Sequence, residues 1–178
     1  DYIVGRLNAF GLDGVTEEPF QAPHWRRGSA EGKILSPVQR PFPLLALPLN
    51  RTHKVRAKAV WAPFETKEDF ALIAGTLKGK ICINRQQPRV GLSGSMLHRA
   101  ERVRLVHEAG GAAFLWVSNW QGHVLPTGSM DPTIAKTMPA FGITLEDAQL
   151  FERLGRAGEL ELELETENEL EQGTSWNV

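Results

Sequence analysis

The histidines are the side chains of this sequence best suited to bind a catalytic metal ion, yet their spacing does not favour it. A hydrolytic metal site needs two or more His, Asp or Glu ligands that converge on one point. His98 and His107 fall in one expected helix, but nine residues turn them about half a circle apart. The sequence has no H-E-x-x-H and no H-x-D pattern. We therefore expect no metal site among the five histidines: His24, His53, His98, His107 and His123.

Nucleophilic catalysis has equally little support. Residues 91–95 (GLSGS) are similar to a G-x-S-x-G turn, but Ser95 stands where the second glycine is required. The single cysteine, Cys82, lies in the apolar run 81–83, which indicates a buried small side chain and excludes an internal disulfide. Neither form of glycine-rich phosphate loop is present. We predict that the chain holds no catalytic residue and is not an enzyme by itself.

Two aromatic clusters are better suited to contacts than to chemistry. The first joins aromatic and guanidinium groups, a mixture enriched at protein interfaces, and the second opens a long loop after an apolar run. We predict that a contact site or cleft rim is formed by His24, Trp25, Arg26, Trp120 and His123. The alternative is that Trp25 of the first cluster and Trp116 of the second are core residues, and that the loop is simply solvated.

Composition narrows the class of protein. The 178 residues include 20 basic and 21 acidic side chains, for a formal net charge of −1, which argues against a nucleic-acid partner. No apolar stretch is long enough to span a membrane, and no signal peptide opens the chain. The sequence begins within an expected helix and stops where a strand is expected to begin, so we interpret it as a fragment. Residues 50–52 (NRT) match a glycosylation acceptor.

The first third of the sequence predicts a helix followed by irregular structure. Hydrophobic residues at helical spacing favour a helix over residues 1–10, which Gly11 would end. Six of the eleven prolines lie between Pro19 and Pro48. Because proline disrupts the interior of a sheet, we expect short extended segments with irregular connections here. These extended segments are 15–22, 33–36 and 44–49.

The rest of the chain alternates between strands and helices. Thr66 and Thr144 are expected N-caps, and Gly110-Gly111 is an expected helix stop. Residues 159–165 alternate strictly between glutamate and leucine, which predicts a strand with one acidic face that repels itself. An acidic linker is expected over 166–174. The expected strands are 55–64, 81–83, 112–117, 138–143 and 159–165, with helices over 66–77, 97–109 and 144–154 and loops over 85–96 and 119–137.

Several short motifs, in order and spacing, resemble a known domain. Residues 77–81 (LKGKI), 109–113 (AGGAA) and 138–143 (MPAFGI) resemble the protease-associated domain. Residues 7–15, 23–28 and 175–178 are similar to the segments that border that domain in carboxypeptidase Q-like zinc peptidases of the M28 type. The resemblance covers nearly the whole chain.

The resemblance implies a β-rich α/β fold, with a mixed sheet or open barrel-like core flanked by two or three helices. Residues 31–166 would form the protease-associated domain. Residues 1–30 would belong to a missing catalytic domain, and 167–178 would lead back to it as an acidic linker. Two zinc ions are implied for that missing part and none for this chain.

The function implied is that of an accessory domain in an extracellular or periplasmic zinc exopeptidase, an aminopeptidase or carboxypeptidase. It would cover the active-site cleft, influence access of peptide substrates and contact the catalytic domain of the same polypeptide. A stand-alone peptide-binding or protein-binding module of a receptor-type protein is the alternative, and a self-sufficient hydrolase is a third.

Overall fold

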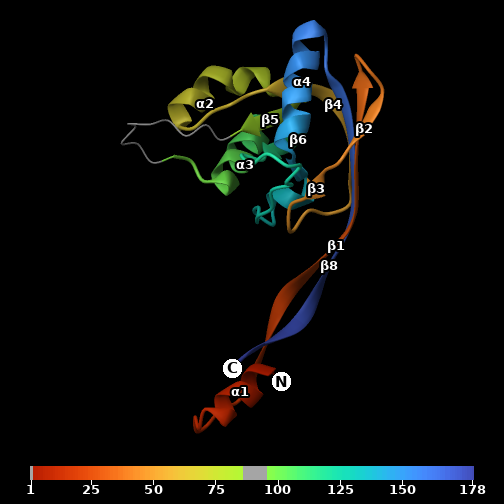
Figure 1. The fold of residues 1–178 in the computed structure, drawn as a ribbon. Helices are drawn as coiled ribbons and strands as arrows, with labels where there is room; N and C mark the ends of the chain where they lie inside the picture. The colour runs from red at the N-terminus through yellow and green to blue at the C-terminus, as the bar shows by residue number, and fades with distance from the viewer. Residues whose placement is uncertain (1, 86–95) are drawn as a thin grey trace. The chain divides into compact units, whose positions relative to one another are not determined.

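The computed structural model describes residues 2–85 and 96–178 and divides into two units. One unit contains residues 27–169, and the other contains residues up to 26 together with 170–178. The expected loop over 85–96 lies almost entirely outside the described residues. The fold class is the predicted one, a mixed α/β arrangement around one curled sheet of eight strands (Figure 1).

The strands follow the order β2-β1-β8-β4-β5-β6-β7-β3 across the sheet. Its centre is parallel from β4 to β7, whereas β8 joins β4 and β3 joins β7 in antiparallel pairs. Strand β2 pairs antiparallel with the end of β1. The bounds are β1 Glu18–Ser36, β2 Arg40–Phe42, β3 Leu45–Ala46, β4 His53–Trp61, β5 Ile81–Arg85, β6 Ala113–Val117, β7 Ala140–Ile143 and β8 Glu161–Asn177.

Helices α2 and α4 begin at the caps that the sequence predicts, whereas the N-cap of α3 is His98. Thr66 and Asp69 form a reciprocal capping box at α2, and the Thr144 hydroxyl accepts the Asp147 amide at α4, 3.0 Å away. Gly110, with φ of 75°, ends α3 as expected. No helix in the described residues is long and apolar enough to cross a bilayer. The bounds are α1 Tyr2–Ala9, α2 Lys67–Ile73, η1 Ala74–Thr76, α3 Arg99–Glu108, η2 Ile134–Lys136 and α4 Leu145–Ala157.

The core of the larger unit lies on both faces of the central sheet. Alternate residues of a strand point to opposite faces, so Cys82 and Phe114 face one side and Ile83 faces the other. The first face packs against α2, α3 and η2 in one buried cluster. On the second face, Phe151 of α4 packs edge-on against Phe42 of β2, with ring centroids 4.8 Å apart. Helices therefore cover both faces of the parallel strands.

A buried ion pair crosses the first of these faces. Arg102 of α3 is fully buried, and its guanidinium lies 2.5 Å from the Glu65 carboxylate, which is 3% exposed. The same guanidinium donates to the carbonyls of Phe64 and Leu97 and to the side chain of Asn84. Because every polar contact is made inside the protein, the charge remains paired without water.

The acidic face of β8 is neutralised by its neighbour. Glu161 and Glu165 pair with Arg56 and Lys54 of β4 at 2.9 and 2.7 Å. The leucines between the glutamates point to the opposite side of the strand and are buried. The predicted strand is confirmed, but its glutamates form ion pairs with a row of cations and do not simply repel one another.

Two strands are much longer than the sequence predicted. Residues 166–174 were expected to be a linker, but they belong to β8, and the proline-rich start belongs to β1. Strand β2 pairs with β1 only at Gly32–Ile34, so one edge of the segment with Pro19 and Pro23 is not paired with β2. Proline, which has no backbone N–H, is tolerated at such an edge. The Thr166 hydroxyl donates to the Ser29 carbonyl at 2.9 Å, which helps to continue the pairing.

The glycosylation acceptor of residues 50–52 is not accessible in the folded chain. Asn50 is fully buried, and its amide donates to the Ala140 carbonyl at 2.6 Å and accepts from the Ala140 amide at 3.1 Å. The side chain therefore joins the segment after β3 to β7, and its role is structural.

Removing the buried guanidinium should destabilise the larger unit strongly. We expect Arg102→Met to lower the free energy of unfolding by about 3–5 kcal/mol, because Glu65 would keep a buried and unpaired charge. Urea unfolding followed by circular dichroism measures this loss.

Arg104→Met is the matched control on the same helix. Arg104 forms ion pairs with Glu101 and Glu108 at the surface, so its loss should have a far smaller effect. Equal losses of unfolding free energy in the two variants would show that the buried ion pair stabilises the protein no more than the surface ion pairs do.

Candidate functional site

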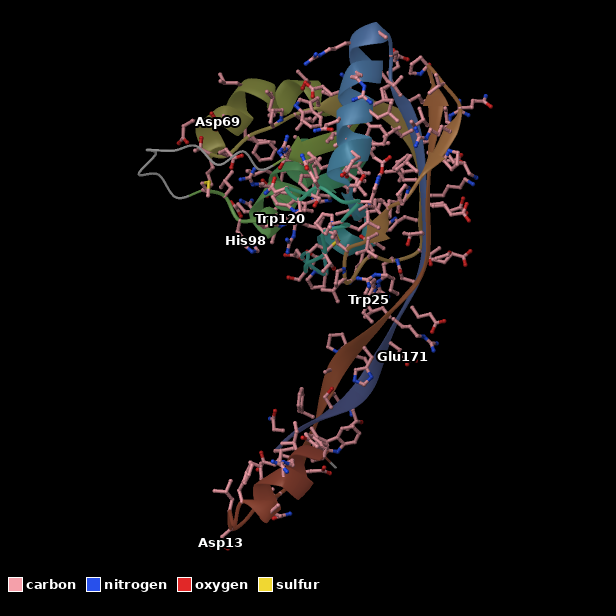
Figure 2. The ribbon with its side chains drawn as sticks, viewed as in Figure 1. Asp13, Trp25, Asp69, His98, Trp120 and Glu171 are labelled. Atoms are coloured by element: carbon pink, nitrogen blue, oxygen red, sulfur yellow. The ribbon has the colours of Figure 1, made fainter. Side chains whose placement is uncertain are left out.

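The loop that follows β6 presents an exposed aromatic side chain on an anchored backbone. Trp120 is 74% exposed, whereas Ser118, two residues before it, is buried. The Ser118 hydroxyl accepts the Trp120 amide at 3.2 Å and lies 3.3 Å from the Trp120 carbonyl. Figure 2 shows Trp120 within the larger unit. Tryptophan is enriched among the residues that contribute most to binding at protein interfaces, so an exposed Trp120 on a bonded backbone is a candidate contact residue.

The next residues of this loop are tied to α4. The Gly122 amide donates to a Glu146 carboxylate oxygen at 2.8 Å. This bond is the main reason why the pKa of Glu146 lies below its usual range, with a smaller contribution from His123. His123 has φ of 57°, an uncommon conformation for a residue other than glycine. The structure thus brings Trp120 and His123, both predicted, into one fixed loop.

Trp116 lies beneath this region and belongs to the core. It is 8% exposed, which agrees with the alternative interpretation that it is a core residue. The guanidinium groups of Arg102 and Arg99 lie 5.6 and 5.8 Å from its ring centroid. Arg99 also fills the space that a side chain at Gly128 would need: an added Cβ would lie 1.7 Å from the Arg99 Nη2. Sequence reasoning missed Arg99, since no local motif links it to Trp116.

The other predicted cluster lies on β1 in the smaller unit. Trp25, labelled in Figure 2, is half-buried, and its neighbours His24 and Arg26 are exposed to solvent. The His24 Nε2 lies 3.2 Å from the Ser175 hydroxyl of β8. A side chain at Gly173 would collide with the His24 ring, so glycine permits this close approach. These residues therefore join the two strands of a ribbon.

The remaining histidines have separate structural partners. The His98 side chain accepts the Ala100 amide and caps α3, and His53 contacts the Ala135 carbonyl at 2.9 Å. His107 contacts the Thr137 hydroxyl at 3.0 Å. Within residues 2–85 and 96–178, no three His, Cys, Asp or Glu side chains are grouped as metal ligands would be.

Cys82 has the environment expected of a core residue. It is fully buried in β5, and burial raises the pKa of its thiol far above the usual range. Its thiol form is therefore favoured at neutral pH, and the nucleophilic thiolate is suppressed.

The fold of this chain is similar to parts of solved peptidase structures. No family model matches the chain, and no curated protein matches its sequence. Among solved structures, an M28 peptidase precursor from Shewanella amazonensis matches 99% of this chain at 27% identity and a TM-score of 0.73. An aminopeptidase from Aneurinibacillus sp. strain AM-1 matches 98% at 22% identity, also with a TM-score of 0.73. A zinc aminopeptidase from Bacillus subtilis matches 98% at 20% identity and a TM-score of 0.61.

These matches confirm the resemblance to a part of the M28-type peptidases. The chain covers 43%, 39% and 38% of those three structures, so it spans about two fifths of their length. The narrower assignment to carboxypeptidase Q-like enzymes stays a prediction, as does the use of the five rim residues.

The bond between Glu146 and the loop should be measurable. We expect Glu146→Ala to speed amide hydrogen exchange at Gly122 and His123, because the carboxylate that accepts the Gly122 amide is removed. Since the bond lowers the pKa of Glu146, its contribution is present above the ordinary glutamate pKa of about 4.3 and is lost as pH falls through the lowered value. Hydrogen exchange with mass spectrometry tests both statements.

Glu152→Ala is the control on the same helix. Glu152 pairs with Arg156 of the same helix at 2.6 Å, so exchange at residues 118–125 should stay as in the parent chain. Unchanged exchange in Glu146→Ala would mean that the loop is held by other contacts.

Proposed function

We propose that this chain is a non-catalytic accessory part of an M28-type zinc exopeptidase, where it borders the active-site cleft and influences which peptides enter. The likeness to M28 structures over nearly the whole chain, at about two fifths of their length, supports this. The catalytic zinc ions would then be bound by residues outside this chain. The precursor named among the similar structures favours a secreted or periplasmic protein.

The apolar surface of the smaller unit is the observation on which the proposal mainly depends. Helix α1 has no buried residue. This unit of 35 residues contains seven large hydrophobic side chains that are 43–79% exposed: Tyr2, Ile3, Phe10, Leu12, Phe20, Trp176 and Val178. Apolar surface of this density usually marks an interface. We propose that the catalytic domain of the same polypeptide covers it.

The larger unit has a different character, which suits an accessory role. It has its own core and needs no second domain to bury its apolar residues. The exposed Trp120 on a fixed loop then offers a surface at which a long substrate makes contact and a short substrate makes none. We propose this loop, with His123, as the part that discriminates substrates by length.

A stand-alone peptide-binding module remains the second candidate. The independent core of the larger unit and the exposed Trp120 favour it. The two candidates differ in whether the smaller unit is buried in the complete protein, which the first experiment below measures.

Substitution of Ile3 tests the docking surface. Ile3 is 58% exposed, so Ile3→Glu should leave the melting temperature of the isolated chain unchanged. In the complete peptidase the same change should destabilise by about 2–3 kcal/mol, because it removes a buried isoleucine and inserts a carboxylate into the interface. Differential scanning fluorimetry of both proteins measures the contrast.

Leu72→Glu is the matched control, since Leu72 is 85% exposed on α2 of the other unit. It should be neutral in both proteins. A neutral Ile3→Glu in the complete protein would contradict docking and favour the stand-alone module.

Substitution of Trp120 tests the effect on substrate length. In the complete peptidase, we expect Trp120→Ala to change kcat/KM for a decapeptide about 2–10-fold, the range that corresponds to a lost aromatic contact. Hydrolysis of a single-residue chromogenic amide should not change. Leu72→Ala serves as the control, and equal effects on both substrates would reject length discrimination by this loop.

A further inference from the structure

A groove of about 530 Å³ opens on the second face of the sheet, between α4 and strands β4 and β5. Its apolar lining comes from Ala59 and Trp61, which are half-buried, together with Ile83, Phe151 and Leu160, which are buried. Charged side chains border this lining: Lys58, Lys80, Glu152, Arg156 and Glu159. The size and the mixture of an apolar interior with a few charged groups are typical of small-ligand sites, which span about 300–1,000 Å³.

The groove exists because side chains are missing at the end of α4. Gly155 and Gly158 line it, and an added Cβ at either position would meet no heavy atom within 4 Å. Ala59 of β4 also lines it with only a methyl group. A glycine within a helix costs about 1 kcal/mol relative to alanine. The sequence therefore keeps this space open at some expense in helix stability.

The charges around the groove leave one cation unmatched. Lys58 pairs with Glu159 at 2.5 Å, and Arg156 pairs with Glu152 at 2.6 Å. For Lys80, the described residues provide no ion pair or hydrogen bond to its ammonium group. A complementary ligand therefore carries one negative charge next to an apolar group.

We propose that this groove binds the C-terminal end of a peptide, with the last apolar side chain against Trp61 and the terminal carboxylate at Lys80. A peptide end provides one carboxylate directly beside one side chain, which matches the single ammonium beside the apolar wall. The choice of a peptide over another carboxylic acid rests on the proposed peptidase function. The groove itself belongs to one unit and does not depend on that function.

Binding can be measured on the 178-residue chain alone, so a failed accessory role would not affect the result. Isothermal titration would compare acetyl-Gly-Gly-Leu, its C-terminal carboxamide and 4-phenylbutyrate. We expect the free peptide acid to bind, and the carboxamide to bind at least about tenfold more weakly because the charge-assisted bond is lost. Lys80→Gln should weaken the acid by a similar factor.

Gly155→Leu fills the groove while favouring the helix, so the variant is expected to fold. It should abolish binding of the peptide acid. Gly75→Leu is the matched control, because Gly75 also faces open space but does not line the groove. Circular dichroism confirms that both variants fold.

The proposal is overturned if the peptide acid shows no binding up to about 10 mM, a limit weaker than ordinary ligand affinities. Equal binding of acid and carboxamide, or unchanged binding in Gly155→Leu, would also overturn it. Binding of 4-phenylbutyrate without binding of the peptide acid would reject a peptide end as the ligand.

Discussion

The buried pair of Arg102 and Glu65 is the interaction on which the larger unit depends. Two charges removed from water are favourable only when their hydrogen bonds are complete, and here the guanidinium reaches Glu65, the Phe64 and Leu97 carbonyls and Asn84. These groups come from the segment after β4, from β5 and from the start of α3. The pair therefore fixes the carboxyl ends of neighbouring parallel strands. Trp116, whose ring lies against the same guanidinium, connects β6 to this arrangement just before the loop that presents Trp120.

Among its described residues, the smaller unit contributes none of the buried hydrophobic core residues. Its helix α1 has no buried residue, and side-chain hydrogen bonds such as that from Gln21 to Thr174 at 3.0 Å join its two strands. Exposed hydrogen bonds contribute little net free energy to folding. A unit of this kind would therefore be stabilised mainly by a second surface that covers its apolar side chains. The larger unit thus has its own hydrophobic core, whereas the smaller unit exposes large hydrophobic side chains of the kind found at interfaces. This contrast supports the different roles proposed above for the two units.

Local sequence patterns predicted the helices and strands well, but they did not predict contacts between residues that are far apart in the sequence. Thr66, Thr144 and Gly110 marked helix ends correctly, since caps depend on residues only a few positions apart. The extensions of β1 and β8 were missed because prolines and acidic residues are read locally as breakers, while an open strand edge tolerates both. Lys54, Arg56 and Lys58 alternate in the sequence, but their pairing with the glutamates that border and form β8 was not predicted, because the two strands lie about a hundred residues apart. By contrast, Arg102 and Glu65 lie 37 residues apart, and nothing local links them.

Helix α4 positions both proposed contact surfaces of the larger unit. Glu146 near its start holds the Trp120 loop, and Gly155 near its end opens the groove. At 1.5 Å per residue, these nine residues correspond to about 14 Å along the helix axis. An extended peptide advances about 3.3 Å per residue, so about four residues cover that length. A peptide of four or more residues, with its last residue in the proposed groove, would then cover the length of helix between the two proposed surfaces, whereas a dipeptide would not. Selection by length would follow from the length of one rigid helix and would need no movement of the domain.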